Sequence, residues 1–496
     1  MNEGMGISVN KKEKPNIVLI TTDTQRCDTL RCMGSPFAIS PHLDRLASEG
    51  VLFTNAHTAS PVCSPARSSL MTGLHAPIHG CIENGIDRKS GHLTFPDLLQ
   101  EQGYVNIMVG KTHFGEHPAS FDIVREIKGE KSAASVDDSY AKFINSYGLP
   151  RSSAGPRSMP DHLHMDAFLI NATIEEIEAC RQAENGPFFA FCSLLSPHSP
   201  LDPPGHWATL FDSTPLPPID YKPGDVENLP LHTRRLLGFI GNEAELEASL
   251  NTPEALQAME HKRRLYYGMT AFIDAQIGRL LEYLDQTGLR ENTLILFTSD
   301  HGTQLFDHGF DDKHNYLDAT WRIPFIMSMP GTLPCGKVCD FATWTDIAAT
   351  ILAAGGTYSR YVQGFDLFTP LIQGLDSPRR CAVGTLYKSA AVATQRWKLE
   401  YYFEEQTGMM YDRLNDPSER SNLYNDPQYD SVKQELLVAL LTWRADLSDL
   451  QLMEESQQVG GPVAQRIKPY SLAKSGWEVE RRLGAKAEAI DLLFEV

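Results

Sequence analysis

Short runs of hydrophobic residues recur along the chain and are separated by longer segments of mixed polarity. The first run, NIVLITT at residues 16–22, is almost continuous in Ile, Val, Leu and Thr. Such a run is typical of a strand whose two faces are both covered. Similar runs follow at residues 105–109, 188–195, 293–299 and 324–329. They predict further buried strands of the same sheet.

Helical patterns lie between these runs. Ser40 and Pro41 open a segment that closes at Gly50, so an N-cap, a first-turn proline and a terminal glycine are all in place. A longer segment before Gly288 has apolar residues at helical spacing: Ile273, Ile277, Leu280, Leu281 and Leu284. The alternation of strands and helices predicts an α/β fold with a large mixed, mainly parallel sheet flanked by helices.

The pattern changes near Arg379. Residues 381–385, 390–394 and 398–403 predict short strands, and residues 432–446 predict an amphipathic helix that packs on them. We therefore expect a smaller C-terminal α+β subdomain. The predicted organisation is a disordered segment at 1–14, a catalytic α/β domain at 15–378, the subdomain at 379–456 and a tail at 457–496. The apolar end of that tail docks on the same subunit or on a neighbour in a homo-oligomer.

Charge and cysteine content narrow the class of protein. The 496 residues carry a formal net charge of −19, which argues against nucleic-acid and membrane-surface partners. The first fifteen residues lack the apolar core of a secretory signal, and no run reaches the roughly 18 apolar residues of a membrane span. Nine scattered cysteines are then best interpreted as reduced thiols. We expect a cytoplasmic protein.

The segment PVCSPARSSLMTG at residues 61–73 carries the most specific chemical signal. Pro65 suits a first helical turn and Gly73 suits a left-handed helix end. Cys63 then lies at a helix N-terminus, where the potential is positive, with Arg67 one turn along on the same face. His75 and His79 follow this segment and are expected on the rim of the pocket, with no role assigned.

Two carboxylates follow buried strands. Asp23 ends the first strand run and Asp300 ends the run at 293–299. Carboxyl ends of parallel strands meet at one edge of a sheet, so the two side chains can converge on one cation. Oxygen ligands of this kind suit Ca²⁺, Mg²⁺ or Mn²⁺ better than zinc. The alternative is that each Asp caps the helix or turn that follows it.

Four further segments complete the picture: GYVNIMVGKTH at 103–113, LSPHSP at 195–200, Lys313 placed nine residues before Arg322-Ile323-Pro324, and MMYDRLNDPSERSNL at 409–423. Together with C-x-P-x-R, these segments and their order resemble the type I, formylglycine-dependent sulfatases of the alkaline phosphatase superfamily. The resemblance extends from about residue 15 to about residue 425. It implies an alkaline phosphatase-like fold and the hydrolysis of sulfate monoesters to an alcohol and inorganic sulfate.

The resemblance also implies a role for each matching residue. Cys63 is oxidised to formylglycine (3-oxoalanine), whose hydrate is the nucleophile and binds one divalent cation, with Ca²⁺ favoured over Mg²⁺ or Mn²⁺. The other implied metal ligands are Asp23, Thr24, Asp300 and His301. Thr24 stands where many sulfatases have a second acid or a glutamine, and His301 stands where many have asparagine. The remaining catalytic positions are Arg67, Lys111, His113, His198 and Lys313.

The implied mechanism has two stages. One hydroxyl of the hydrate attacks sulfur and the alcohol leaves, with His198 or Lys313 as general acid, while Arg67 and Lys111 hold the hydrate. The second hydroxyl then loses its proton to His113, and collapse of the hemiacetal releases sulfate and restores the aldehyde. A serine in place of Cys63 would leave a stable sulfate ester.

Two other functions remain open on the sequence. A phosphonate monoester or phosphodiester hydrolase can use the same nucleophile and metal, and a non-catalytic relative can use the fold for binding. The expected partners are a small-molecule or short-saccharide sulfate ester and a formylglycine-generating enzyme. The segments at 125–165, at 196–230 and in the tail are expected to shape the leaving-group side of the pocket.

Overall fold

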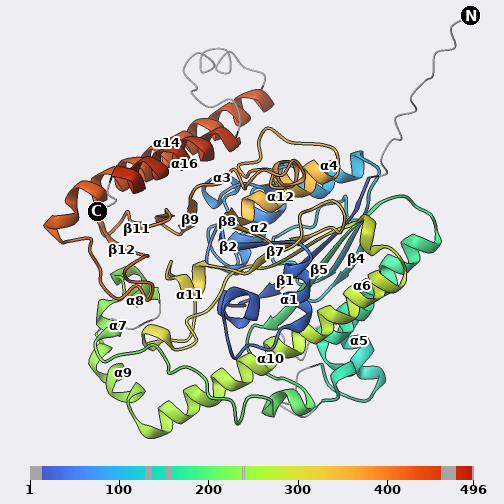
Figure 1. The fold of residues 1–496 in the computed structure, drawn as a ribbon, viewed down its shortest axis with the longest axis horizontal. Helices are drawn as coiled ribbons and strands as arrows, with labels where there is room; N and C mark the ends of the chain where they lie inside the picture. The colour runs from blue at the N-terminus through green and yellow to red at the C-terminus, as the bar shows by residue number, and fades with distance from the viewer. Residues whose placement is uncertain are drawn as a thin grey trace, which may run out of the picture.

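The computed structural model describes residues 14–128, 137–151, 159–236, 238, 241–459 and 476–493. An eight-stranded sheet forms the centre, with helices on both faces, and a separate four-stranded sheet lies beside it (Figure 1). The predicted disordered segment at 1–14 falls outside the described residues except for Lys14. No helix within the described ranges is both long enough and apolar enough to cross a bilayer.

The large sheet has the strand order β4-β3-β5-β1-β6-β7-β2-β8. All neighbouring strands are parallel except β7, which runs antiparallel to β6 and to β2. The predicted mixed, mainly parallel sheet is therefore confirmed. The strands are β1 (Asn16–Asp23), β2 (Val51–His57), β3 (Val105–Gly110), β4 (Ile123–Glu126), β5 (Phe188–Pro197), β6 (Thr293–Ser299), β7 (Phe325–Ser328) and β8 (Lys337–Thr343).

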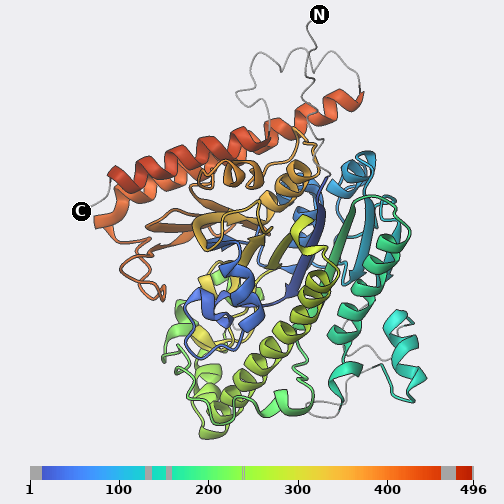
Figure 2. The ribbon, with the colours of Figure 1, turned by 45° about the vertical axis from the view of Figure 1, so that its right-hand side comes forward.

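Helices bury both faces of this sheet, as Figure 2 shows from a second direction. Alternate residues of β1 point to opposite sides: Ile17 and Leu19 join one core, and Val18 and Ile20 join the other. The first core lies under α2 (Cys63–Thr72), α4 (Phe95–Glu101), α12 (Trp344–Ala354) and α13 (Phe368–Ile372). The second lies under α1 (Pro41–Ser48), α6 (Met165–Gln182) and α10 (Pro253–Gln286).

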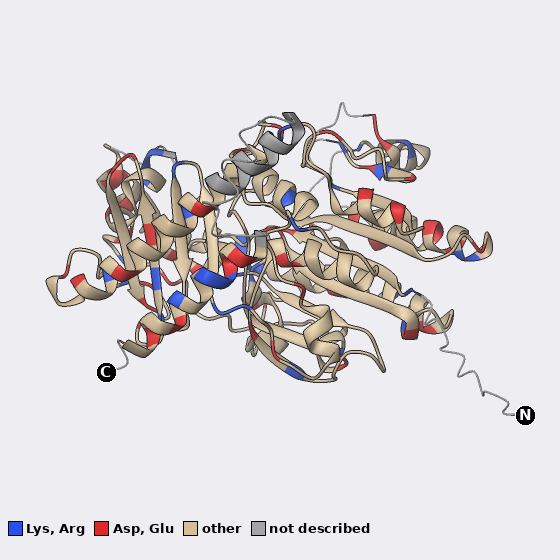
Figure 3. Cartoon of the chain, turned by 90° about the horizontal axis from the view of Figure 1, so that it is seen from above, with Lys and Arg blue, Asp and Glu red and all other residues tan. Residues whose placement is uncertain are grey.

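Shorter helices occupy the connections. They are α3 (Ala76–His79), α5 (Ser139–Ser146), α7 (Asp225–Asn228), α8 (Leu231–Leu236), α9 (Glu243–Leu250) and α11 (Asp318–Trp321). The proline-rich segment at 196–230 is largely irregular, as predicted, with α7 near its end. Acidic residues are distributed along the outer helices in the view of Figure 3 rather than gathered on one of them.

The C-terminal region forms the predicted small sheet with helices packed on it. The antiparallel strands are β9 (Ala382–Leu386), β10 (Ser389–Ala393), β11 (Trp397–Tyr402) and β12 (Thr407–Asp412). Along one side of this sheet run α14 (Asp430–Val459) and α16 (Gly476–Leu493), which lie side by side in Figures 1 and 2.

The tail helix α16 docks on its own chain. Its residues Val479, Leu483 and Ile490 are buried in one cluster with Leu436 and Trp443 of α14. Leu492 and Leu493 near the end of α16 are exposed, and residues 460–475 and 494–496 lie outside the described part of the chain, so where the apolar end of the tail docks remains a prediction. The domain boundaries at 378 and 456 remain predictions.

Candidate active site

The helix α2 presents Cys63 at its first position. Pro65 lies in the first turn, and Gly73 ends the helix in a left-handed conformation with φ 67°, as predicted. The backbone N–H of Ser64 donates to Asn84 Oδ1 at 3.0 Å, so a side chain from the following loop caps the helix. Every residue of α2 is buried, and Cys63 is only 1% exposed. The sulfur therefore lies at a positive helix end, inside the protein.

Two basic side chains contact the sulfur of Cys63. Lys313 Nζ donates to Sγ at 3.2 Å, and His301 Nε2 lies 3.1 Å from Sγ. Burial and the charge of Asp23 raise the pKa of the Cys63 thiol, but Lys111, Lys313 and His301 outweigh both and hold that pKa well below its usual range. The pocket thus stabilises negative charge at the position of this side chain.

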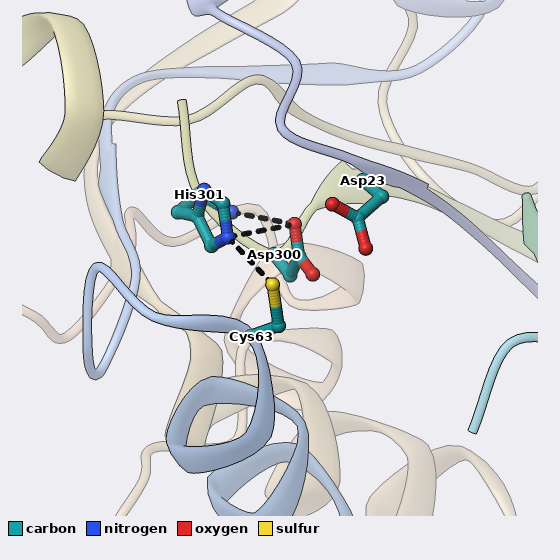
Figure 4. A group of neighbouring side chains, drawn as sticks. All are labelled: Asp23, Cys63, Asp300 and His301. Atoms are coloured by element: carbon teal, nitrogen blue, oxygen red, sulfur yellow. Dashed lines mark hydrogen bonds and ion pairs between the residues drawn. The ribbon is translucent and has the colours of Figure 1, made fainter. Parts of the chain in front are cut away.

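Four potential ligand atoms converge beside α2 (Figure 4). Since β1 pairs in parallel with β6, Asp23 and Asp300 emerge at the same edge of the sheet. Their carboxylate oxygens, Cys63 Sγ and a ring nitrogen of His301 all lie within 4.8 Å of one another, and all four residues are buried. Two carboxylates, one imidazole and one thiol or its oxidised product fit a divalent cation.

Arginine and lysine partly balance the two buried carboxylates. Arg67 donates from Nε to Asp300 Oδ2 at 2.9 Å and from a terminal nitrogen to Asp23 Oδ2 at 3.3 Å. Its other terminal nitrogen donates to Ser193 Oγ at 2.8 Å. Lys111 also donates to Asp23. Burial raises the pKa of Asp23, but Lys111, His198 and Arg67 together bring it well below the ordinary value.

Thr24 organises the two carboxylates through a left-handed backbone, with φ 66°. Its N–H donates to Asp300 Oδ1 at 3.0 Å, and its hydroxyl donates to Asp23 Oδ1 at 2.7 Å. In His301, Nδ1 lies 2.8 Å from the carbonyl oxygen of Gly302, which leaves Nε2 facing Cys63. Metal ligation by Thr24 remains a prediction.

The two remaining predicted histidines lie farther out. His198 is half-buried, with Nδ1 2.8 Å from the carbonyl oxygen of Ser199, and it is near enough to Asp23 for its charge to lower the pKa of that carboxyl. His113 is exposed, with φ 52°. The structure thus brings Cys63, Arg67, Lys111 and Lys313 together in the interior and leaves His113 at the surface. The catalytic role of each remains a prediction.

Three residues of the site were not predicted: Glu83 and Asn84, which lie beside α2, and Ser193 of β5, which holds Arg67. The only sequence signal for Glu83 and Asn84 is that they follow Cys63 closely along the chain, about one loop away. The expectation for His75 and His79 was wrong. Both side chains are fully buried and have interior partners. His75 Nε2 lies 3.0 Å from Glu480 of α16, and His79 Nε2 lies 2.9 Å from Ser69 Oγ.

Comparison with known families agrees with this geometry. A sulfatase profile matches residues 15–357, and a profile described as N-sulphoglucosamine sulphohydrolase, C-terminal, matches residues 306–446. An arylsulfatase from Clostridium perfringens is 29% identical over 459 residues, which cover 84% of this chain and 91% of the relative. An N-acetylglucosamine-6-O-sulfatase from Bacteroides thetaiotaomicron is 24% identical, covering 90% and 87%.

Relatives with broader chemistry are also similar. A multifunctional alkaline phosphatase superfamily protein from Trinickia caryophylli is 26% identical, covering 88% of this chain and 96% of its own. Among solved structures, a phosphonate monoester hydrolase of Agrobacterium radiobacter superposes with a TM-score of 0.75 at 23% identity, covering 87% and 96%. A chain in complex with its substrate D-glucosamine-2-N,6-O-disulfate superposes at 0.72 and 22%, covering 88% and 99%. At these identities the structures show a shared fold.

Proposed function

The chain belongs to the sulfatase family and is a sulfuric ester hydrolase, and we propose that it cleaves sulfate monoesters with a nucleophile made from Cys63. The observation that carries the proposal is the position of the Cys63 sulfur, 3.2 Å from Lys313 Nζ and 3.1 Å from His301 Nε2. Lys313 places positive charge where a sulfate group would meet the nucleophile, and His301 places a ligand nitrogen there. The residue at 63 would be formylglycine, and its hydrate would supply the attacking hydroxyl.

A divalent cation, with Ca²⁺ favoured, would be held by Asp23, Asp300, His301 and the modified residue at 63. When bound, it would neutralise charge on the sulfate oxygens and lower the pKa of the attacking hydroxyl. The donor set supports this assignment because two buried carboxylates stand within 4.8 Å of the other ligands. Thr24 would keep both carboxylates oriented through its N–H and hydroxyl.

The basic side chains would do the remaining work. Lys313 would attract the sulfate oxygens, and Lys111, now bonded to Asp23, would hold the hydrate together with Arg67. His198 or Lys313 would donate the proton to the departing alcohol. His113 would accept a proton from the second hydroxyl, and because its side chain is exposed, it would have to turn inward to do so.

The substrate would be a small sulfate ester or a short sulfated saccharide. The named activities of the relatives support this class, since they include an arylsulfatase and an N-acetylglucosamine-6-O-sulfatase. A formylglycine-generating enzyme would be the maturation partner. The cytoplasmic location and a homo-oligomer remain predictions.

A second candidate is hydrolysis of phosphonate monoesters or phosphodiesters by the same nucleophile. Similarity to a relative named multifunctional favours keeping it, because that relative is matched over 96% of its length. Catalytic efficiencies on an aryl sulfate, a phosphate diester and a phosphonate monoester separate the two functions. We expect the aryl sulfate to be hydrolysed with the highest kcat/KM.

The experiment that tests the proposal is the mass of the tryptic peptide containing Cys63, from a host that has the maturation enzyme. We expect a peptide that has lost H₂S and gained one oxygen, and that reacts with a hydrazide. Cys63→Ser should reduce turnover of an aryl sulfate by roughly a thousandfold or more, with trapping of a sulfated protein. An unmodified, alkylatable thiol in active protein, or full turnover by Cys63→Ser, would contradict the proposal.

A further inference from the structure

A loop and a helix end bring Glu83 and Asn84 to the edge of the nucleophile pocket. Asn84 Oδ1 accepts the N–H of Ser64, the residue after Cys63, at 3.0 Å. Glu83 Oε1 in turn accepts the N–H of Asn84 at 2.8 Å. The Glu83 carboxylate is therefore held beside the first turn of α2, and its separation from Cys63 is short enough for the two charges to influence each other.

His314 lies close to Glu83. It follows Lys313, whose Nζ contacts Cys63, and its backbone is left-handed with φ 72°. His314 Nε2 lies 3.8 Å from Glu83 Oε1, and each side chain is 19% exposed. Two segments that are more than 200 residues apart in sequence thus form a polar pair at the partly open side of the site.

The direction of substrate entry follows from burial. Asp23, Arg67 and Asp300 have no exposed side-chain surface, so they close the deep side of the pocket. Glu83 and His314 keep some exposure. The Glu83 and His314 side is therefore a partly exposed part of the pocket toward which the alcohol portion of a bound sulfate ester can extend.

The charge presented on that side is negative. Burial raises the pKa of Glu83, but the nearby His314 and the hydrogen bond from the Asn84 N–H bring it below the ordinary value, so the side chain is a carboxylate. Two of the basic residues deeper in the pocket have a carboxylate partner of their own, since Arg67 and Lys111 both pair with Asp23. A second anion on a leaving alcohol that lies beside Glu83 would meet this negative charge, whose basic neighbour His314 lies 3.8 Å away.

We propose that Glu83, supported by His314, is a specificity-determining residue that selects sulfate esters whose leaving alcohol carries no second anionic group near the ester oxygen. The inference rests on the proposed function, since it concerns the same pocket. Neutral, hydroxyl-bearing alcohols are the preferred class, because a carboxylate accepts hydrogen bonds from hydroxyl groups. Polyanionic alcohols are disfavoured by like-charge repulsion in a half-buried site.

The test compares 4-nitrophenyl sulfate with 3-carboxy-4-nitrophenyl sulfate, which differ by one charge on the leaving group. The measured quantity is the ratio of kcat/KM for the charged ester to that for the neutral ester. Glu83→Gln should raise this ratio about tenfold. His314→Ala removes the group that screens Glu83 and should lower the ratio severalfold. A merely structural effect would move the ratio in the same direction in both variants, or not at all.

Glu291→Gln is the matched control, because it removes the same charge from an exposed residue just before β6, away from the carboxyl ends of the strands. Its ratio of kcat/KM values should equal that of the unsubstituted protein.

A second assay compares binding in place of turnover. The ratio of the affinities for the charged and the neutral ester is measured by calorimetric titration of both esters into Cys63→Ala protein, with and without Glu83→Gln. Binding does not require turnover, so a failure of sulfate ester hydrolysis stays separate from a failure of this inference. Unchanged ratios for Glu83→Gln in both assays would overturn it.

Discussion

Three of the residues of the site that are not glycine have a left-handed backbone. They are Thr24, His113 and His314, with φ between 52° and 72°. Such conformations cost about 1–2 kcal/mol each for ordinary residues, so surrounding structure has to maintain them. At Thr24 the maintaining contacts are the hydrogen bonds to Asp23 and Asp300. The geometry of the site is therefore set by backbone strain as well as by residue type.

Asp274 is a single residue that makes the stability of the fold depend on pH. It lies in α10 and accepts the N–H groups of His42 and Leu43 at the start of α1. Burial raises the pKa of Asp274 to about 7. Between about pH 4 and pH 7 the Asp274 carboxyl therefore keeps its proton in the folded state and has lost it in the unfolded state. The contribution of this group to the free energy of unfolding is present in full below about pH 4 and is lost as the pH rises through 7.

Asp274→Asn should remove that dependence. Relative to the unsubstituted protein, the variant should gain on the order of 2–4 kcal/mol in unfolding free energy between pH 4.5 and pH 8. Denaturant unfolding at the two pH values measures the change. Asp285→Asn on the same helix, where the carboxylate is 38% exposed and pairs with Arg45, is the control. A difference between variant and parent that stays constant with pH would rule out the assigned titration.

At this scale the sequence predicted which residues gather but not how they are supported. Cys63, Asp23, Asp300 and Lys313 were found because each lies in a motif or at a strand end. Ser193, which accepts a hydrogen bond from Arg67, and Glu83, which meets His314, gave no local signal. Their roles arise only from contacts over more than 100 residues of sequence, and such pairings are not encoded in short spacings.

Among the elements, the close approach of β3 to β5 fixes the position of Lys111. Gly110 has φ 111°, and a Cβ there would lie 1.9 Å from the carbonyl oxygen of Ser193. That oxygen accepts the N–H of Lys111 at 3.0 Å. Glycine is required at this position because any side chain would force the two strands apart.

Gly110→Ala should therefore displace Lys111 from Asp23. We expect aryl sulfate turnover to fall at least tenfold and the unfolding free energy to fall by about 2–4 kcal/mol. Gly103→Ala is the matched control, because Gly103 also has positive φ but its Cβ would meet nothing within 4 Å. The control should lose only about 1–2 kcal/mol and keep its turnover. Equal losses in both variants would show that strand separation is not the cause.

Strand prediction succeeded for the strands that contain a continuous apolar run and missed β2, β4, β8 and β12. Every residue of β5 and β6 is buried, and both were predicted from their apolar runs. The short strand β4 and the strand β8, with its partly exposed Lys337 and Asp340, lie at the two edges of the large sheet and have no such run. The strand β12 overlaps the start of the 409–423 motif, and that motif predicts no strand. Half-exposed edge strands show neither a continuous run of hydrophobic residues nor a strict alternation of hydrophobic and polar residues.

On the scale of the whole molecule, the tail helix completes a buried ionic network. Glu480 of α16 lies 2.9 Å from Arg379 and 3.0 Å from His75, and it accepts the Trp443 indole N–H at 2.8 Å. Arg379 also pairs with Asp346 of α12. Burial raises the pKa of Glu480, but His75 and Arg379 together bring it to about 2. The helix α16 thus supplies the negative charge that partners the buried Arg379 and His75.

Glu480→Gln should destabilise the protein by about 3–5 kcal/mol, because it leaves Arg379 short of one buried partner. Thermal or denaturant unfolding at pH 7 measures the loss. The unsubstituted protein should lose this same contribution as pH falls from about 4.5 toward 2, since the carboxylate must then be protonated. Glu488→Gln, on the same helix but 53% exposed, should have little effect. If both variants unfold alike, the buried network does not stabilise the fold.

The contact between His75 and Glu480 has a consequence for the order of synthesis. A ribosome makes the whole of the large sheet, from β1 through β8, before it adds the last buried carboxylate of the interior. More than 400 residues separate the end of the nucleophile segment from that partner. A nascent chain therefore passes through a long interval in which the strands are present and His75 and Arg379 still lack Glu480. The Glu480 network therefore cannot form before α16 has been translated.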